Sequence, residues 1–218
     1  MQIKYKEKSI DIIDKKITGI VSNSVSNIIK FNENLGSEVY IISYFNVQNM
    51  NEGIVEDFLN AKKNEDMLSD VLKTLNINSK ILSKNISELS TSEKIKLLIV
   101  NALLKNYEVI YFDNILPCLD SSSRTKLYKL IIKLKKFQNK TILISDINID
   151  NIFEFVDNLI IVSDTIINGN KYDVFPCDII NNPITLTLRD KILENKNIDI
   201  GKVDSVNELI KAIYREIR

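Results

Sequence analysis

The sequence predicts an α/β protein with a mainly parallel sheet flanked by helices. Between residues 109 and 162, short runs that are apolar throughout alternate with amphipathic segments, which is typical of a parallel sheet covered on both faces. A chain of 218 residues with 44% hydrophobic residues can form one substantial core with a small lobe. We therefore expect a main domain over residues 1–175 and a small helical appendage over residues 176–218.

Buried strands are expected where β-branched and aromatic residues gather in short runs between polar turns. The N-terminal third is less regular, because a loop rich in Ser and Asn follows its first run and leads into a short amphipathic segment. The predicted strands cover residues 17–21, 39–45, 109–112, 141–147 and 159–162.

Helices are expected where apolar residues recur at helical spacing. Ser90 and Glu93 have the spacing of a capping box and predict a helix over residues 91–104. A helix over residues 121–137 presents one apolar face, formed by Leu127, Leu130, Ile131 and Leu134. Further helices are expected over residues 66–75, 152–155, 185–193 and 205–217.

Composition excludes several classes of function. Lys+Arg and Asp+Glu each number 29, so no basic surplus indicates binding to nucleic acid or to an anionic membrane. No histidine is present, which excludes a histidine base, metal ligand or phosphate sensor. Two distant cysteines and the lack of a long apolar stretch favour a cytosolic protein that is neither secreted nor membrane-spanning.

Residues 86–167 contain an ordered series of motifs. The first part reads ISELSTSEKIKLLIVNALLKNYEVIYFDNILPCLDSSSRTKLYKLI, and the second reads TILISDINIDNIFEFVDNLIIVSDTII. This region resembles the C-terminal half of an ABC-transporter ATPase, with its signature motif, Walker B strand, D-loop and switch-histidine strand in order and at family spacing. The resemblance implies a P-loop NTPase-like fold.

The N-terminal half resembles the same family less closely. KITGIVSNSVSNIIKF is similar to the strand and phosphate loop that begin the ATPase core, with Gly19 before the loop. The following interval is short, so we expect a reduced N-terminal β-subdomain. The tail after residue 175 resembles that of ATPases of the energy-coupling-factor (ECF) type.

The phosphate loop lacks every residue that the resemblance requires. Glycines let backbone amides approach phosphates, a lysine neutralises their charge and a hydroxyl holds magnesium. When the segment is aligned with this motif, Ser22 and Asn27 stand at the two glycine positions. Ile28 stands at the lysine position and Ile29 at the position of the hydroxyl residue. Ile28 and Ile29 have the character of core residues that begin a helix. We call residues 22–29 the phosphate-loop remnant.

The hydrolytic residues are also incomplete. Asp113 corresponds to the Walker B aspartate and is the candidate magnesium ligand, although it could instead cap the turn after its strand. Asn114 stands where the family has a catalytic glutamate, and an amide cannot accept a proton from water. Ile147 occupies the switch-histidine position.

Three residues match family positions outside this loop. Ser90 in LSTSE and Asp120 in LPCLD correspond to the signature serine and the D-loop aspartate, which would face a nucleotide held by a partner subunit. Ser90 and Asp120 each have a simpler explanation as a helix cap. The negative charge of Glu93 would also repel an anion bound near Ser90. Gln48 is the Q-loop candidate, with an exposed loop glutamine as the alternative.

These matches predict a pseudo-ATPase: a cytosolic importer subunit, on the inner face of the membrane, that forms a homo- or heterodimer with an ABC ATPase or docks on an integral-membrane subunit. ATP and magnesium would be bound only if a partner supplied the phosphate site. One alternative is a divergent active ATPase in which Lys30 supplies the missing charge and Ser24 or Ser26 the hydroxyl. The other is a scaffold or regulatory protein outside transport.

Overall fold

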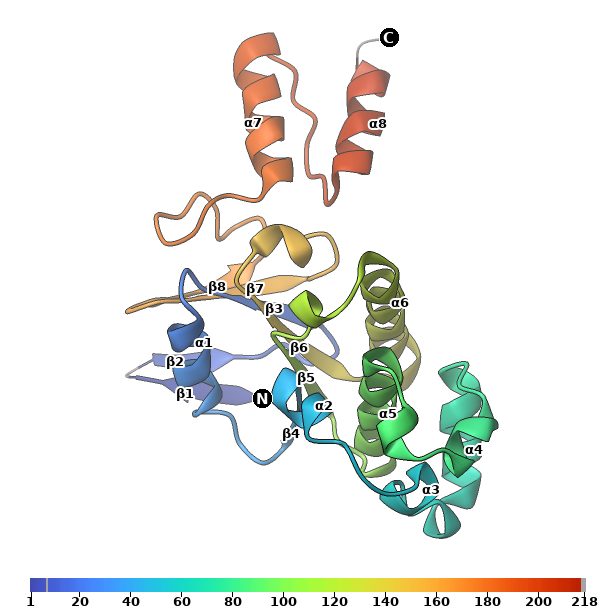
Figure 1. The fold of residues 1–218 in the computed structure, drawn as a ribbon. Helices are drawn as coiled ribbons and strands as arrows, with labels where there is room; N and C mark the ends of the chain where they lie inside the picture. Colours follow the sequence, from blue (N-terminus) through green and yellow to red (C-terminus); the bar gives the residue numbers. More distant parts are fainter. Residues whose placement is uncertain (7, 217–218) are drawn as a thin grey trace. The chain divides into compact units, whose positions relative to one another are not determined.

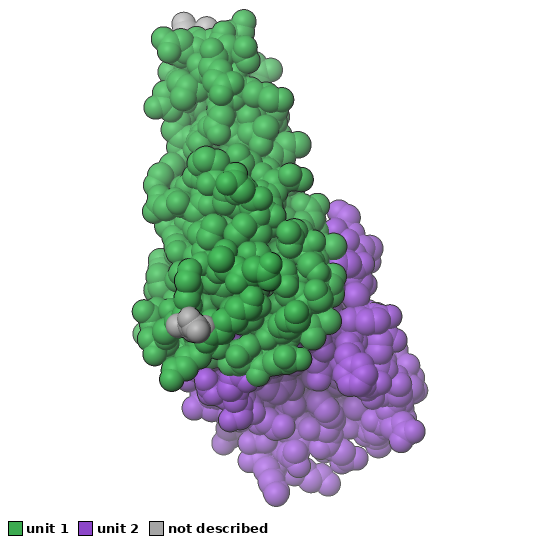
Figure 2. Space-filling view, turned by 90° about the vertical axis from the view of Figure 1, so that its left-hand side faces the viewer, with its two compact units in different colours: residues 1–34, 144–218 green, residues 35–143 purple. Residues whose placement is uncertain are grey.

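The computed structural model describes residues 1–6 and 8–216 and divides them into two compact units. Unit 1 contains residues 1–34 and 144–218, and unit 2 contains residues 35–143; they are green and purple in Figure 2. The division does not test the predicted boundary after residue 175, which stays a prediction.

Unit 1 is organised around β3 (Ile17–Val21), which pairs in parallel with β7 (Asn158–Val162). β8 (Ile166–Asn170) then pairs with β7 in the antiparallel direction. β6 (Thr141–Asp146) is buried along its length, and the boundary between the units falls within it. The sequence did not predict β8, because only its first residue is buried and the strand contains glycine and two asparagines.

A hairpin of β1 (Gln2–Tyr5) and β2 (Lys8–Asp11) adds a two-stranded antiparallel sheet that was not predicted. Its strands are short and rich in lysine, so their apolar residues do not form a run. Ile3, Tyr5 and Ile10 are buried, and the Tyr5 ring lies 5.8 Å from that of Phe31 in α1 (Val25–Asn32). The hairpin is thereby packed on α1, the helix that begins within the phosphate-loop remnant.

Gly19 is expected to be essential for the packing of β3. A Cβ at this position would lie 2.8 Å from Leu159 Cδ2, 2.9 Å from Ile152 Cδ1 and 3.2 Å from Val156 Cγ1. These neighbours are fully or almost fully buried and have no room to move. We predict that Gly19→Ala lowers the free energy of unfolding by about 1–3 kcal/mol, as overpacking does. Urea unfolding measures this, and a stability equal to that of the native chain would contradict the packing described.

Unit 2 contains β4 (Val39–Ser43) and β5 (Val109–Asp113), which pair in parallel so that Ser43 is opposite Asp113. The strand prediction of 39–45 was too long, because α2 (Tyr44–Gln48) begins immediately after β4. A capping box causes the change: the Ser43 side chain accepts from the Asn46 amide, and the Asn46 side chain accepts from the Ser43 amide, both at 3.2 Å. The mainly parallel α/β prediction is confirmed.

The remaining helices of unit 2 lie to one side of this strand pair, with α5 next to β4 and α4 next to α5 (Figure 1). They are α3 (Val55–Phe58), α4 (Glu65–Thr74), α5 (Thr91–Leu104) and α6 (Ser121–Gln138). The predicted apolar face of α6 is buried as expected. Single 3-10 turns lie at Ala61–Lys63, Ser79–Ser83, Ile86–Glu88, Leu116–Cys118 and, in unit 1, Ile149–Asn151.

The predicted helix at 152–155 is wrong. Only the 3-10 turn at Ile149–Asn151 forms, and the chain then passes through a turn. Side chains take the local amides: Asp146 Oδ1 accepts from the Asn148 amide at 2.8 Å, and Asn148 Oδ1 accepts from the Asp150 amide at 3.0 Å. Asn148 thereby caps the 3-10 turn, and beyond it the Phe153 amide donates to the Ile149 carbonyl at 2.9 Å without a regular helix following.

Two helices, α7 (Ile184–Lys196) and α8 (Val206–Glu216), lie side by side at the end of unit 1 (Figure 1). They confirm the predicted helical tail, although Ile217 lies outside the described residues. Val203, Leu209 and Ala212 form a small core for them. Across residues 1–6 and 8–216, no helix is both long enough and apolar enough to cross a bilayer.

A buried lysine attaches this tail to the rest of unit 1. Lys171 is 6% exposed, and its ammonium donates to the Phe153 carbonyl at 3.0 Å and the Glu154 carbonyl at 3.4 Å. It also pairs with Asp204 at 2.6 Å, and the Tyr172 hydroxyl donates to the same carboxylate. Burial, with the Asp204 carboxylate adding to it, raises the pKa of Tyr172. Tyr172 therefore stays a hydrogen-bond donor.

Candidate functional site

The phosphate-loop remnant is folded around the Ser22 hydroxyl. Ser22 is fully buried at the end of β3, and its Oγ donates to the Val162 carbonyl at 2.6 Å. The same oxygen accepts from the Ser24 amide at 3.2 Å and from Asn27 Nδ2 at 3.3 Å. A hydroxyl has one donor and two acceptor positions, so this group is fully used. Ser22 and Asn27, which the sequence resemblance predicts to stand at the two glycine positions, thus bond to each other, and Ser22 ties the loop to β7.

The two isoleucines of the remnant have different environments. Ile28 is 2% exposed, whereas Ile29 is 54% exposed, so the expectation that both are core residues is wrong for Ile29. Consecutive helical residues point about 100° apart, and only one of them can face the core. The alternative phosphate ligands are all at the surface: Lys30 is exposed, and the hydroxyls of Ser24 and Ser26 lie 2.8 Å apart.

A cleft of about 710 Å³ lies beside the remnant within unit 1. Its walls come from residues 21–23, residues 147–150 and residues 177–182. Ile147, at the switch position, is 51% exposed and lies on this cleft together with Ser22. Asp150 and Asp178 are the charged residues among the described residues that line it, and no basic side chain is present there.

Residues 177–182 were not predicted to belong to the site. They follow a buried Val174 and precede a buried Pro183, so both ends of the segment are packed against unit 1. Asp150 Oδ1 accepts from the Ile184 amide at 2.8 Å and fixes the C-terminal end beside the switch region. The sequence of this segment carries no motif that could have indicated its position.

The Walker B remnant lies in unit 2. Asp113 ends β5, is partly buried, and accepts a hydrogen bond from the Tyr111 hydroxyl at 3.1 Å. Asn114 follows with φ of 46°, in the left-handed region that asparagine tolerates better than glutamate does. The backbone conformation of this turn suits an asparagine, and the correspondence of Asn114 to a catalytic position stays a prediction. Gln48 is exposed at the end of α2, and its role as a Q-loop residue stays a prediction.

Ser90 caps α5 as predicted. Its amide and hydroxyl donate to Glu93 Oε2 at 2.9 and 2.8 Å, and its Oγ accepts from the Glu93 amide at 3.3 Å. These hydrogen bonds from the Ser90 amide and hydroxyl lower the pKa of Glu93, and Lys84 adds to the effect at 3.3 Å. The capping box forms in full, and the Ser90 hydroxyl is engaged within it.

This capping box is expected to contribute a pH-dependent increment of stability. Because the pKa of Glu93 is lowered by folding, the increment is complete above the ordinary glutamate pKa of about 4.3 and is lost as pH falls through the lower folded value. We predict that Glu93→Gln lowers the free energy of unfolding by about 0.5–1 kcal/mol at pH 7. Urea unfolding at pH 7 and pH 3 measures it, and a difference that persisted unchanged at pH 3 would contradict the assignment.

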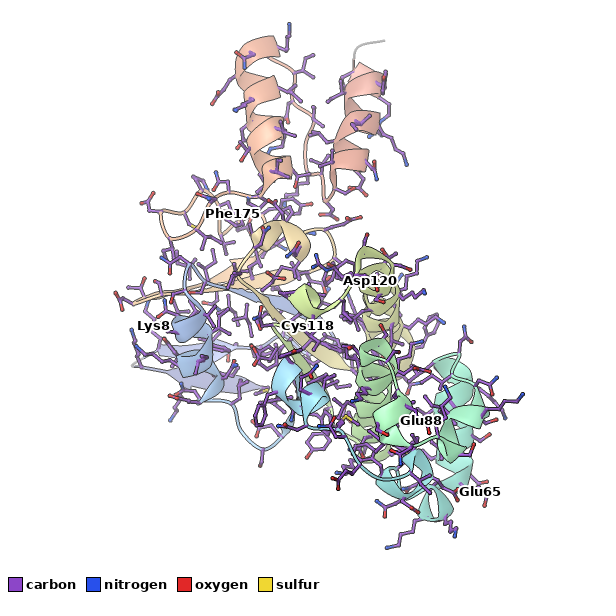
Figure 3. The ribbon with its side chains drawn as sticks, in the orientation of Figure 1. Lys8, Glu65, Glu88, Cys118, Asp120 and Phe175 are labelled. Atoms are coloured by element: carbon purple, nitrogen blue, oxygen red, sulfur yellow. The ribbon has the colours of Figure 1, made fainter. Side chains whose placement is uncertain are left out.

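Asp120 caps the N-terminus of α6, which was the simpler of the two explanations for this residue (Figure 3). Its carboxylate accepts from the Ser123 amide at 2.8 Å and the Ser123 hydroxyl at 3.0 Å. The Ser123 amide and hydroxyl lower the pKa of Asp120, and Lys126 assists. The Ser123 hydroxyl also accepts from Ser92 Oγ at 3.0 Å, which joins the beginnings of α5 and α6.

Ser90 and Asp120 lie on one cavity of about 460 Å³ within unit 2. The beginnings of α5 and α6 form its polar part, and Leu127 and Leu130 belong to its apolar part. Lys96 and Lys126 also line it, beside Cys118, whose pKa is raised by burial. The two positions that resemble partner-facing residues therefore line the same cavity, and their role toward a partner stays a prediction.

The fold of the chain is that of an ABC ATPase. Unit 1 contributes β3, the phosphate-loop remnant and α1, and unit 2 contributes the capped helices α5 and α6. The chain superposes on cbiO1 from Clostridium perfringens, part of the ABC transporter complex cbiONQ, with a TM-score of 0.63 and 18% identity over 89% of this chain and 92% of that one. An ATP-binding cassette of an ABC transporter in its ADP conformation gives a TM-score of 0.62 and 15% identity over 80% and 93%.

Sequence comparison agrees. The zinc import ATP-binding protein ZnuC of Ehrlichia chaffeensis is 33% identical over 135 residues, covering 59% of this chain and 54% of the relative. The energy-coupling factor transporter ATP-binding protein EcfA1 of Fusobacterium nucleatum is 30% identical over 132 residues, covering 60% and 49%. The chain thus spans about half the length of these relatives, and no family profile matches it. It is a relative of the ABC-transporter ATP-binding proteins and has their fold.

Proposed function

We propose that this chain is a catalytically degenerate ABC-type ATPase subunit, a cytosolic component of an importer. The observation that carries the proposal is the closed phosphate-loop remnant. The Ser22 hydroxyl is hydrogen-bonded to Val162, Ser24 and Asn27. Ile28, at the lysine position, has its side chain buried in the core. A loop arranged in this way offers neither the backbone approach nor the charge that a triphosphate needs.

The charge of the neighbouring cleft supports the same proposal. Asp150 and Asp178 line the space beside the remnant, where a nucleotide phosphate would require cations. Like charges in a partly enclosed cleft repel, and no basic side chain among its described lining residues offsets them. Bound ATP would therefore be opposed both by the shape of the loop and by its surroundings.

Pairing with an ATPase that holds ATP and magnesium is the second part of the proposal. Ser90 and Asp120 share one cavity, as residues that face a partner's nucleotide would. Both side chains also cap their own helices, so a phosphate would compete with Glu93 for the Ser90 hydroxyl. We expect the contact between subunits to be mainly structural.

The relatives indicate which kind of importer to expect. The names of these relatives describe zinc import and energy-coupling factor transport, and the structural neighbour cbiO1 is part of a complex named as an ABC transporter. We propose an importer of this general type, ECF-like on the basis of the helical tail, with the chain docked on a membrane subunit at the inner face of the membrane.

Copurification from native membranes tests this assignment. Full-length chain carrying an affinity tag is expected to recover an integral-membrane protein together with a second ATPase that has an intact phosphate loop. Recovery of a wholly soluble partner would contradict the transport role and favour the scaffold or regulatory alternative.

The divergent-ATPase alternative makes a different prediction. Lys30 lies two residues after the lysine position, about 200° around α1 from Ile28, and its side chain is exposed. If it supplied the missing charge, Lys30→Ala would abolish ATP hydrolysis by the chain. Our proposal expects no hydrolysis above background in either form.

A further inference from the structure

The surface of α6 carries a one-sided stripe of positive charge. The sequence of this helix contains no acidic residue. Its lysines at i, i+3, i+7 and i+10 lie on one side of the helix, next to the face that carries the buried leucines, because three or four residues make one helical turn. We call this set the lysine stripe: Lys126, Lys129, Lys133 and Lys136.

The stripe is accessible and is not neutralised. Three of its members are exposed and Lys133 is partly exposed. Among the described residues, no ion pair with a carboxylate is formed by any of the four. Asp120 lies near Lys126 at one end, where their charges interact. The net charge of zero thus conceals a local excess of positive charge.

An aromatic side chain adjoins the same surface at its C-terminal end. Phe137 is 70% exposed and is adjacent in sequence to the last lysine of the stripe. A large exposed ring beside cationic side chains is the combination that binds at the headgroup region of a membrane, where the ring inserts and the ammonium groups contact phosphates. The stripe is straight and about 15 Å long at 1.5 Å per residue, which suits a flat surface.

We propose that the lysine stripe, with Phe137 at its end, is a docking surface for anionic phospholipids. Lysine ammonium groups bind lipid phosphates as point charges, and the rigid helix presents them together. The inference does not depend on nucleotide binding, because it does not involve the phosphate-loop remnant. Of the four stripe lysines, Lys126 also lines the cavity of Ser90 and Asp120, and the other three do not. It adds a lipid contact to any contact with a protein subunit.

Vesicle sedimentation tests the proposal. We expect the full chain to bind vesicles of phosphatidylcholine with about a third phosphatidylglycerol, and to bind pure phosphatidylcholine far more weakly. Lys→Gln at all four stripe positions is expected to weaken binding roughly 100-fold, and added salt should weaken native binding. The matched control removes the same charge from exposed lysines on other helices, and it should bind like the native chain: Lys73, Lys191, Lys196 and Lys211.

Fluorescence gives a second readout, because the chain contains no tryptophan. Phe137→Trp is expected to shift its emission to shorter wavelength on anionic vesicles and to become protected from an aqueous quencher. Tyr214→Trp on α8, where Tyr214 is 72% exposed, is expected to show neither change.

Three results would overturn the proposal. The first is absence of binding to anionic vesicles, and the second is an equal loss in the stripe variant and the matched control. The third is stripe-dependent binding of duplex DNA without binding of vesicles, which would assign the surface to nucleic acid. Nucleotide affinity is measured separately, so failure here leaves the proposed function intact.

Discussion

Ile28→Lys, which restores the lysine of the phosphate loop, is expected to lower the free energy of unfolding by about 3 kcal/mol or more. Ile28 is 2% exposed at the start of α1, and a lysine there would place an ammonium group in an apolar environment. Urea unfolding measures the loss. If the variant does not fold, Ile28→Ala is expected to cost about 2–4 kcal/mol through the cavity that it leaves.

Ile29→Lys is the matched control for this change. Ile29 is adjacent in sequence and 54% exposed, so we expect its replacement to change stability by less than about 0.5 kcal/mol. Equal effects of the two substitutions would show that Ile28 does not face the core. The comparison separates the direction of the side chain from any general effect of positive charge on α1.

Asp204→Ala is expected to have a comparable effect, lowering the free energy of unfolding by about 3 kcal/mol. The change removes the carboxylate that lies 2.6 Å from the buried Lys171 ammonium and also accepts from Tyr172. Removing one partner leaves a buried charge with only carbonyl partners, which is costly. The side chain of Asp204 is 39% exposed, so the value lies near the lower end for buried pairs.

Two further variants distinguish the loss of the Lys171–Asp204 ion pair from a general effect of removing charge. Adding Lys171→Met to Asp204→Ala should recover part of the stability, since an apolar side chain replaces the unpaired ammonium. Lys202 lies 5.0 Å from the Tyr172 ring centroid and is exposed, so Lys202→Met is expected to cost less than about 1 kcal/mol. No recovery in the double variant would contradict the ion-pair account.

The sequence was sufficient for the elements with strong periodicity. α5 and β3 have the predicted bounds, and α6 buries the predicted face, because capping residues and apolar runs determine them locally. The hairpin of β1 and β2 and the edge strand β8 were missed, since their stability comes from packing against distant residues such as Phe31 and from pairing with β7. The segment after β6 was predicted as a helix at residues 152–155, whereas the structure has the 3-10 turn Ile149–Asn151 followed by a turn.

The site could be predicted only in part. The replacement of the phosphate-loop residues is visible in the sequence, as are the caps at Ser90 and Asp120. The hydrogen bond from Ser22 to Val162 and the position of residues 177–182 beside residues 21–23 bring together parts of the chain that are more than a hundred positions apart. No local pattern encodes such contacts.

Equilibrium binding of ATP to the isolated chain, with magnesium and by titration calorimetry, tests the central claim most directly. We predict no saturable binding below the millimolar range, because Ser22 closes the loop, Ile28 faces the core, and Asp150 and Asp178 line the cleft. A micromolar dissociation constant for ATP would contradict the account.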